Sequence, residues 1–491
     1  MGVWNWLRKS IFERGRRDTR KGLRLTYDAA AWGAESARHW RGADNLSPDY
    51  ALSESVRRTI ANRARYELAN GGYVAGILDT LALHVVGTGP RLELTPADEV
   101  PENARESFRA ALDRREKRWR DWAAAVDLAN VLKMARRARC SDGEVFFVRG
   151  LRPELAAPVR LFYTLYEAQQ VCNPDYVSIP AQNTAGNTIA VDGIQYAADG
   201  APLRYYICRD YQTGDRAQGQ WMAAPNVIHY AHYTRPGQHR GVSELAPTLC
   251  VFNDIRRYCN AVLKCAEIGA EISFLVETDN APLDSDGNST LYQPQGAEAL
   301  DFERGAGIFL PAGWKAAQLK SEQPTTQYPD FVRAKVREAA RALSMPLSIA
   351  LGDSSGYNYA SGRLDHQIYF RRVNADRAEI ERLILSRMLA DFAALDAAAH
   401  PGDYAYSAAA QWMWDGFEHI DPLKEAQASA ARMAAGMSSL AQECAKEGLD
   451  WAAVAAQRAR EKELLDKLGL GAEVAAPAPV DDNERAQDEE E

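Results

Sequence analysis

Three histidines that lie close together in the sequence raise the question of a metal site. His229, His232 and His239 fall within eleven residues, and imidazole nitrogen is a common ligand of zinc. The residues around His229 and His232 predict a strand, in which side chains alternate between two faces, so these two rings would project to opposite sides. The pattern therefore favours histidines on a strand and its following loop over a metal site.

A run of acidic and amide residues imitates a calcium-binding loop but lacks two of its requirements. Asp284, Asp286 and Asn288 occupy alternate positions, as calcium ligands do. Ser289 stands where the sharp turn needs glycine, and Gln295 stands where a bidentate glutamate is needed. The segment is interpreted as a turn.

Sequence motifs that carry common enzymatic chemistry do not occur in the chain. It contains no phosphate-binding P-loop, no GxSxG nucleophile elbow and no HExxH metalloprotease motif. We therefore expect no enzymatic activity, no cofactor and no bound metal. Any ATP-driven work would belong to a partner.

The cysteines indicate a reduced environment. Their number is odd and no CxxC pair occurs, so neither a disulfide framework nor a redox motif is indicated. Buried thiols in a cytoplasmic context are the favoured interpretation. The seven cysteines are Cys140, Cys172, Cys208, Cys250, Cys259, Cys265 and Cys444.

Length, composition and charge narrow the class of protein further. The 491 residues suffice for two or three domains, and 46% hydrophobic with 25% charged residues is ordinary for a folded soluble protein. The net charge of −9 gives no general attraction for nucleic acid, which argues against a DNA-coating protein. We expect no membrane association, because the chain has no run of eighteen apolar residues, no secretory signal and Trp6 where myristoylation needs Ser or Thr.

Two long helices joined by a polar loop, residues 329–398, are the elements around which the chain is organised. The first helix, 329–345, repeats apolar residues such as Val332 and Val336 at helical spacing, and Pro346 is expected to end it. The second helix, 363–399, repeats apolar residues from Leu364 to Phe392. Periodicity alone favours an ordinary helical hairpin, whereas an exposed loop rich in Gly, Ser, Tyr and Asn can also serve as a contact surface.

This loop and its flanking helices resemble the tunnel-loop region of the lambda-like portal proteins of tailed bacteriophages. In that family a helix that ends in a small residue and proline precedes a loop with a GD-S-G-NYSS-R pattern. Two departures are visible: Ser344-Met345 precedes Pro346 where glycine and valine are usual, and Gly362 stands where alanine is common. Gly362 would weaken the second helix by up to ~1 kcal/mol if its position is helical. The pattern is carried by Gly352, Asp353, Ser355, Gly356, Asn358, Tyr359, Ser361 and Arg363.

The resemblance runs from about residue 27 to residue 470. It is strong in residues 59–94, which contain a VGTG turn, and in the RPGQHRG segment at residues 235–241. Several motifs in the family order are more specific than any single match. A W…W-x-DP-x-K pattern is carried by Trp412, Trp414, Asp421, Pro422 and Lys424.

The expected fold class is α+β. Strand signals rich in β-branched and aromatic residues begin after Asp142, and Asp199-Gly200 predicts a hairpin turn between two strands. Further on, the pattern predicts a long helix from Val242 to Ala270, strands, and then the helix that precedes the loop. The resemblance supplies the names of a portal fold: an α/β wing, long stem helices, a small clip, a tunnel loop and a helical crown.

Under that interpretation the chain divides into nine segments. They are a basic N-terminal arm (1–45), the wing (46–241), a stem helix (242–270), the clip (271–325), a second stem helix (326–345), the tunnel loop (346–361), a long tunnel helix that returns to the wing (362–420), the crown (421–470) and a disordered acidic tail (471–491).

The resemblance also implies a function. A portal protein forms a ring, of twelve copies in this family, at one vertex of a phage capsid, and the ring is the conduit for DNA packaging and ejection. Implied partners are further copies of the chain, double-stranded DNA contacted without sequence preference, the large terminase subunit, head–tail connector proteins, and major capsid and scaffold proteins. The protein would lie in the virion, and in the host cytoplasm during assembly. The tunnel loop that lines the DNA channel would comprise Gly352, Asp353, Ser354, Ser355, Gly356, Tyr357, Asn358 and Tyr359.

Arg333, Arg337 and Arg341 are spaced four residues apart and therefore stack along one face of the first helix. This arginine stripe would either bind DNA in the channel or form ion pairs with acidic residues of the neighbouring subunit. Strong phosphate binding repeated around a ring would slow the movement of DNA, so ion pairing between subunits is favoured over DNA binding. Candidate acidic partners on the preceding long helix are Asp254, Glu267 and Glu271.

Two other classes of function stay open at this point. A metal-dependent DNA-processing enzyme of a prophage would need convergent carboxylates and histidines, which the sequence does not assemble. An interaction scaffold would differ from a portal in lacking a closed ring with a channel.

Overall fold

The computed structural model describes residues 41–97, 99–174, 181–183, 188–209, 216–271, 275–278, 314–317, 327–355, 359–417, 422–449 and 451–468. Most of the expected N-terminal arm, most of the expected clip and the expected acidic tail lie outside these residues, as does the calcium-like segment from Asp284 to Gln295.

Helices open the described part of the chain and supply much of its core. The helix α5 is apolar on most of its surface, and seven of its residues are buried, among them Ile77, Leu81 and Val85. Asp127 adopts a left-handed conformation with φ of 49° and turns the chain tightly between two further helices. The helices are α3 (Pro48–Ala51), α4 (Glu54–Asn70), α5 (Gly72–Val86), α6 (Arg105–Ala125) and α7 (Leu128–Asp142).

Two antiparallel sheets follow and confirm the predicted strands. One has the strand order β3-β2-β9 and the other has the order β4-β5-β6-β7-β8. The predicted Asp199-Gly200 turn joins β6 to β7, with Gly200 at φ 84°. Asp192 and Gly193, both at positive φ, form a second two-residue hairpin. The strands are β2 (Glu144–Leu151), β3 (Leu161–Glu167), β4 (Ala181–Asn183), β5 (Thr188–Val191), β6 (Ile194–Tyr196), β7 (Pro202–Ile207), β8 (Gln220–Ala223) and β9 (Val227–Ala231).

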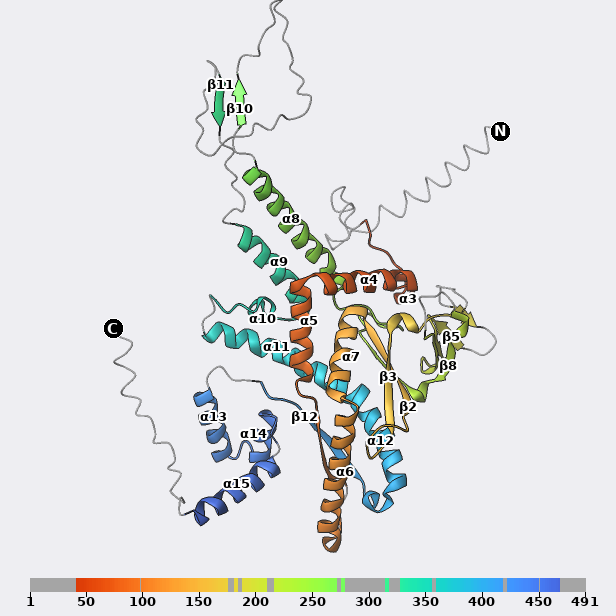
Figure 1. Ribbon diagram of the computed structural model, residues 1–491. Coiled ribbons are helices and arrows are strands. Elements are labelled where there is room, and N and C mark those ends of the chain that lie inside the picture. Colours follow the sequence, from red (N-terminus) through yellow and green to blue (C-terminus); the bar gives the residue numbers. More distant parts are fainter. Residues whose placement is uncertain are drawn as a thin grey trace, which may run out of the picture.

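A helical hairpin projects from the body of the molecule (Figure 1). It consists of α8 (Leu249–Glu271) and α9 (Tyr328–Ala342), and the antiparallel strands β10 (Leu275–Thr278) and β11 (Trp314–Ala317) lie between them in the sequence. Tyr258 of α8 packs on Tyr328 and Phe331 of α9, with ring centroids 5.7 Å and 4.3 Å away. The predicted order of helix, strands and helix is therefore confirmed.

The first helix of this hairpin begins at Leu249 rather than at the predicted Val242. Hydrogen bonds to other parts of the chain hold the preceding residues out of an α-helix: the amide of Val242 donates to the His232 carbonyl, and the amide of Glu244 donates to the Cys140 carbonyl. Pro247, which has no amide hydrogen, then lies in a short 3₁₀ turn. Helical periodicity could not reveal the contact with Cys140, which lies about a hundred positions earlier in the chain.

The second helix of the hairpin ends before Pro346, not at it. Ser344 takes a left-handed conformation with φ of 55°, and the amide of Met345 donates to the Ala340 carbonyl, which closes the helix in a Schellman motif. The family usually has glycine at this position, and glycine adopts this conformation freely. Serine there costs about 1 kcal/mol.

The long helix that follows the loop is interrupted by a π-helical turn. It comprises α11 (Tyr359–Ile380), the turn η7 (Glu381–Leu385) and α12 (Ser386–Ala399). It begins four residues before the predicted Arg363, so Gly362 is helical and the expected destabilisation applies. The short helix α10 (Leu347–Leu351) also lies inside the segment expected to be loop, which shortens that loop.

A two-stranded ribbon pairs a strand from the early part of the chain with a strand from its late part. The strands β1 (Arg91–Pro96) and β12 (Ala408–Met413) are antiparallel, and no other described strand pairs with them. Three helices complete the described chain, in agreement with the helical character expected of residues 422–468. They are α13 (Pro422–Ala434), α14 (Leu440–Lys446) and α15 (Trp451–Lys467).

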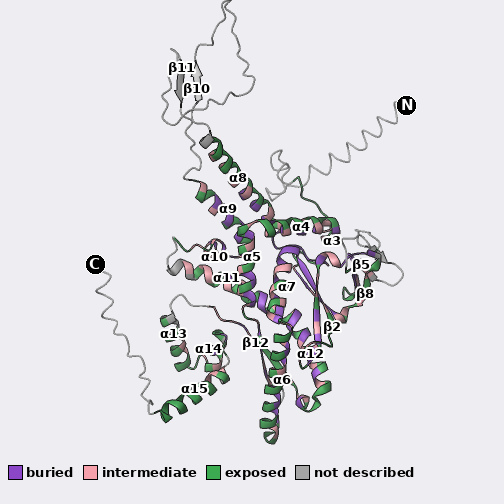
Figure 2. Cartoon of the chain, viewed as in Figure 1, coloured by how far each residue is buried: buried purple, intermediate pink, exposed green. Residues whose placement is uncertain are grey.

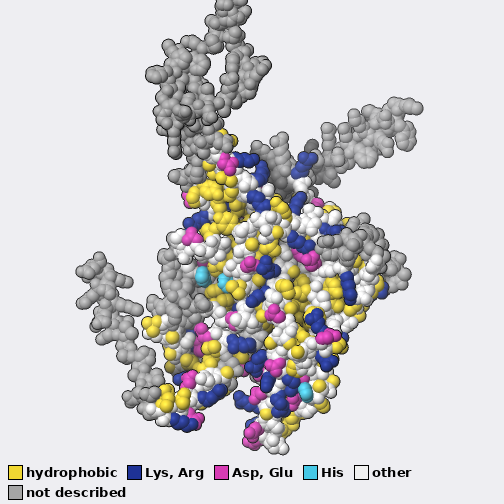
Figure 3. All heavy atoms as spheres, viewed as in Figure 1, with side chains coloured by type: hydrophobic (Ala, Val, Ile, Leu, Met, Phe, Trp, Pro, Cys, Tyr) yellow, Lys and Arg dark blue, Asp and Glu magenta, His cyan; other side chains and the backbone are white. Residues whose placement is uncertain are grey.

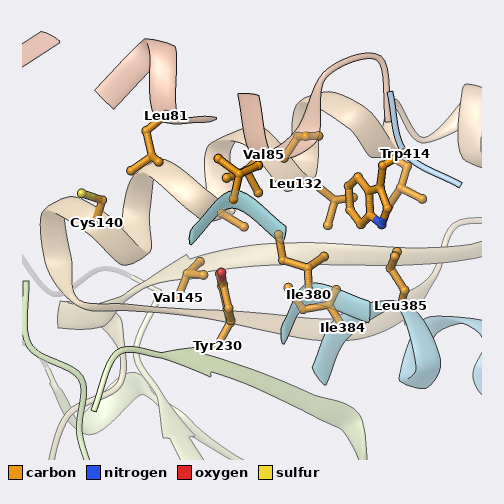
Figure 4. Close-up of a cluster of buried hydrophobic side chains, with 14 of the residues drawn as sticks. Leu81, Val85, Leu132, Cys140, Val145, Tyr230, Ile380, Ile384, Leu385 and Trp414 are labelled. Carbon is orange, nitrogen blue, oxygen red and sulfur yellow. The ribbon is translucent and has the colours of Figure 1, made fainter. Parts of the chain in front are cut away.

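The core lies where α5, α7, α11 and the three-stranded sheet meet (Figure 2). Figure 4 shows Leu81 and Val85 of α5 above Leu132 of α7, with Ile380 and Ile384 of the long helix facing them. The mixture of helices and antiparallel sheets confirms the α+β class. Among the described residues, no helix combines the length and apolar character needed to cross a membrane.

Candidate channel loop and subunit-interface helices

The described half of the expected tunnel loop folds back onto α9. Gly352 caps α10 at φ 64°, a conformation that suits glycine. The Asp353 carboxylate accepts a hydrogen bond from the Ser355 amide at 2.9 Å, and hydrogen bonds from the side chain and then the amide of Ser355 lower the pKa of Asp353. Arg333 of α9 donates to the Ser355 carbonyl at 3.3 Å. These contacts fix the start of the loop, while Ser354 is exposed.

The remaining candidate loop residues divide into two groups. Gly356, Tyr357 and Asn358 lie outside the described residues. Tyr359 is the first residue of α11 rather than a loop residue. The connection between described helices is therefore residues 352–358, and its place relative to a channel remains a prediction.

Two of the three arginines in the stripe on α9 are exposed in a single chain and could therefore contact another subunit. Arg337 and Arg341 are exposed, whereas Arg333 is half-buried against the loop. On α8, Asp254 and Glu267 are also exposed. Glu271 is the last residue of α8. Among the described residues of one chain no ion pair joins the stripe to these acids, so pairing between subunits remains a prediction.

A buried ion cluster anchors α11 to the body. The side chain of Arg136 is 0% exposed and donates to Glu244 at 3.1 Å and to Asp376 at 2.7 Å. Arg139 bridges Glu244 and Glu379, which extends the cluster along α11. Burial alone would raise the pKa of Glu244, but the surrounding guanidinium groups outweigh burial and lower that pKa to about 2. The helix after the loop is thus fixed to α7 and to the segment before α8.

A second buried cluster centres on Glu144, the first residue of β2. Its carboxylate, 0% exposed, accepts hydrogen bonds from Arg57, from Arg240 and from the Gly241 amide. Burial would raise the pKa of Glu144, but Arg240, His229 and Arg57 together hold it well below its usual range. Arg240 also donates to backbone carbonyls between the two sheets, including that of Ala168 at 2.8 Å.

Sequence reasoning missed both clusters, although a signal was present. Arg136 and Arg139 interrupt the apolar face of α7 at Leu132 and Ala135, and charged residues on such a face are buried only when paired. Arg240 and Gly241 belong to the RPGQHRG segment, which the resemblance identifies as a motif without assigning it a role. The structure gives that motif a structural role in joining the two sheets.

The three histidines have separate partners. His229 hydrogen-bonds Glu144 at 2.8 Å, His232 donates to the Val242 carbonyl, and His239 pairs with Asp49 at 2.7 Å. Burial lowers the pKa of His229 despite its carboxylate partner. The described residues bring together no three His, Cys, Asp or Glu side chains that could hold a metal ion.

Large apolar side chains remain exposed along the projecting hairpin and the start of α11. Hydrophobic side chains gather over α8 and α9 in Figure 3. Clustered exposed apolar side chains of this size are typical of surfaces that contact another protein. The residues are Leu263 and Ile268 of α8, Phe331 of α9, and Leu364 and Ile368 of α11, which are 38% to 63% exposed.

Comparison with known proteins agrees with the resemblance. A family model described as "Phage portal protein, lambda family" matches residues 34–377. The portal protein of Escherichia phage N15 is 24% identical over 496 residues, which cover 91% of each chain. The probable portal protein of Halomonas phage phiHAP-1 is 22% identical over 348 residues, which cover 68% of this chain and 65% of that relative.

Among solved structures, a chain in the virion of a native gene transfer agent particle is 16% identical, with a TM-score of 0.43. The match covers 79% of this chain and 92% of that chain. The family model alone spans well over half of the sequence. This chain belongs to the lambda family of phage portal proteins.

Proposed function

We propose that copies of this chain close into a ring at one vertex of a phage or phage-like particle, with twelve copies if the chain follows its family. The ring conducts double-stranded DNA inward during packaging and outward during ejection, through contacts that do not depend on DNA sequence. Its role is structural rather than catalytic. Membership of the portal family supports this proposal.

The observation that carries the ring is the exposed apolar surface on α8, α9 and α11. Side chains such as Leu263 and Leu364 are 58% and 63% exposed in a single chain. A heterologous interface, in which one face of a subunit meets a different face of the next, covers such a surface and closes into a ring. The projecting helices then lie side by side around a common axis.

Native mass spectrometry and negatively stained images of the purified chain test this proposal directly. We expect closed rings with a central hole at micromolar concentration. A population that remains monomeric or dimeric at that concentration would refute the ring. Closed particles without a hole would support the alternative of an interaction scaffold.

The same proposal includes partners at the two ends of the ring. The large terminase subunit would dock during packaging, head–tail connector proteins would dock afterwards, and capsid and scaffold proteins would surround the ring. Family membership supports these partners, as it supports a place in the virion and assembly in the host cytoplasm. Surface plasmon resonance of rings over the large terminase subunit of the same phage is expected to show binding, and no binding would contradict this part.

Deletion of Asp353–Asn358 is expected to leave rings intact and to abolish DNA packaging. The deleted residues connect α10 to α11 and contribute no buried side chain among those described. If the connection lines the narrowest part of the channel, its loss removes the contact with passing DNA. An in vitro packaging assay with rings checked by native mass spectrometry measures the effect, and normal packaging would reduce the segment to a connector.

Arg337→Gln is expected to lower the thermal stability of the ring and to leave the salt dependence of DNA retention unchanged. Arg337 is exposed in a single chain, so its removal costs the monomer little. An arginine–carboxylate pair buried between subunits loses more when one partner is removed than an exposed pair, which contributes ~0–1 kcal/mol. The thermal stability of the ring is measured as the temperature at which it dissociates, followed by native mass spectrometry.

A matched control for this variant is Arg109→Gln. Arg109 is an exposed arginine of α6, outside the projecting helices, and its replacement should leave the ring stability unchanged. If Arg337→Gln rings keep normal stability while DNA slips from them more readily, the stripe lies in the channel instead.

A further inference from the structure

A shallow groove runs between the β1–β12 ribbon and the helix α12, and it contains a buried arginine without a carboxylate partner among the described residues. The groove has a volume of about 550 Å³. Its floor consists mainly of small apolar side chains, including Ala390, Ala393 and Ala410, with Trp412 at one end. Such a floor leaves room for an extended peptide with small side chains.

Arg115 of α6 lines this groove and is 9% exposed. Its guanidinium lies 4.0 Å from the centre of the Tyr404 ring, but its Nε and Nη1 atoms are buried and have no hydrogen-bond partner within the described chain. No ion pair joins it to a described carboxylate. Because an unpaired buried charge is strongly unfavourable, the site favours an incoming carboxylate. Arg382, which is exposed, also lines the groove, as does Glu381, whose carboxylate accepts a hydrogen bond from the Trp414 side chain.

The backbone beside the groove offers a free strand edge. Leu94 of β1 turns its amide away from β12 and donates it to the Glu116 side chain. In the antiparallel register Leu92 faces Trp412 and Leu94 faces Ala410, so the backbone groups of Ala408, Ala410 and Trp412 point to the outer edge. No other described strand pairs with this edge, which can therefore accept an added strand.

One segment of this chain matches both the groove and the edge. Residues 475–482 read AAPAPVDD. Pro477 and Pro479 favour an extended backbone and lack amide hydrogens, and both fall on the same side of an extended strand. The alternate residues Ala476, Ala478 and Val480 keep their amides on the other side. The segment can thus pair along one edge only, with small side chains and two aspartates directly after them.

The chain between this segment and the described structure is long enough to reach the groove. Ala453 of α15 and Met413, the last residue of β12, line the same neighbouring cavity. From Leu468 to Val480 twelve residues span up to about 40 Å when extended. The helix α15 itself measures about 25 Å, so the tail can run back along it to β12.

We propose that residues 475–482 of this chain bind in the groove as a third strand on the outer edge of β12, with Asp481 or Asp482 paired to Arg115. The bound segment ties the C-terminal helices to the ribbon and supplies the missing carboxylate. This inference does not depend on ring formation or on DNA passage. The alternative binding site for the acidic tail is the basic N-terminal arm, residues 8–24, which would attract it by charge.

Photo-crosslinking in the full-length chain tests the proposal. With Asn483 replaced by p-benzoylphenylalanine, we expect crosslinks that mass spectrometry maps to the groove, at residues such as Leu389 and Trp412. Arg115→Met should lower the groove crosslink yield by about tenfold, as expected for loss of a charged hydrogen bond. Arg120→Met, an exposed arginine of the same helix outside the groove, should leave the yield unchanged.

Variants in the tail keep the test valid if Arg115→Met fails to fold. Replacing Asp481 and Asp482 by asparagine should lower the groove crosslinks, whereas replacing Glu489 and Glu490 by glutamine removes the same charge and should not. Ala478→Pro removes an amide from the pairing side and should lower them as well. Crosslinks to residues 8–24, or groove crosslinks that none of these changes reduces, would overturn the proposal.

Discussion

Glu144→Gln is expected to lower the free energy of unfolding of the subunit by about 3–5 kcal/mol, the range for breaking a buried ion pair by removing one partner. The carboxylate of Glu144 is 0% exposed and accepts hydrogen bonds from Arg240 at 2.8 Å and from Arg57 at 3.1 Å. Glutamine has nearly the same shape but no charge. Arg57 would then keep only the carboxylate of Asp192, and Arg240 would keep only the backbone carbonyls of Ala168, Val171 and Asp192, as partners among the described residues.

The size of this effect rests on desolvation of the guanidinium groups that remain. In an exposed pair, water replaces the missing partner, and the pair contributes ~0–1 kcal/mol. Little water reaches Arg57 and Arg240, which are 7% and 2% exposed, so most of the loss is not compensated. The three backbone carbonyls that Arg240 contacts would also lose their alignment if its guanidinium moved.

Urea unfolding measures the free energy of unfolding of Glu144→Gln, and Glu463→Gln serves as the control. Glu463 pairs with Lys467 on the surface of α15, where both side chains are more than two-thirds exposed, so its replacement should change unfolding very little. Similar midpoints for the two variants would show that the Glu144 cluster does not hold the two sheets together.

Much of the fold could be predicted from the sequence because it rests on local pattern. The strands after Asp142, the hairpin turn at Gly200 and the helix that follows the loop all carry periodicity or turn residues that act over a few positions. The family motif located the connection between α10 and α11. These features need no knowledge of distant contacts.

The parts that the sequence could not predict depend on distant residues. Val242 lies in a segment with helical periodicity, yet hydrogen bonds to His232 and Cys140 keep that segment out of an α-helix. The pairing of β1 with β12 joins residues more than three hundred positions apart. The partner of the arginine stripe could not be deduced either, because a contact between subunits leaves no pattern within one chain.

Gly143 shows how a local signal and a distant contact combine at one residue. It follows α7 with φ of 92°, so its place as a helix-ending glycine is a local feature. A Cβ atom there would also lie 2.4 Å from the carbonyl carbon of Val242 and 2.6 Å from its Cα. Gly241 approaches from the other side, where an added Cβ would lie 2.2 Å from the Gly143 carbonyl oxygen.

Gly143→Ala is therefore expected to destabilise the subunit by about 2–5 kcal/mol, the sum of left-handed backbone strain and overpacking. The contact is with backbone atoms of Val242, which cannot rotate away as a side chain would. Moving that backbone would also displace Glu244 and Gly241, and with them the two buried ion clusters on either side.

The control is Gly200→Ala, which isolates the contribution of the close approach. Gly200 has φ of 84°, but no atom lies within 4 Å of its added Cβ, so only the backbone strain of about 1–2 kcal/mol should appear. Both variants are compared by urea unfolding against the unmodified chain. Because the two glycines have similar positive φ angles, the excess loss for Gly143→Ala measures the packing of the α7–β2 junction against the segment before α8. Equal losses would show that this junction can relax, and that the approach of Val242 does not constrain the fold.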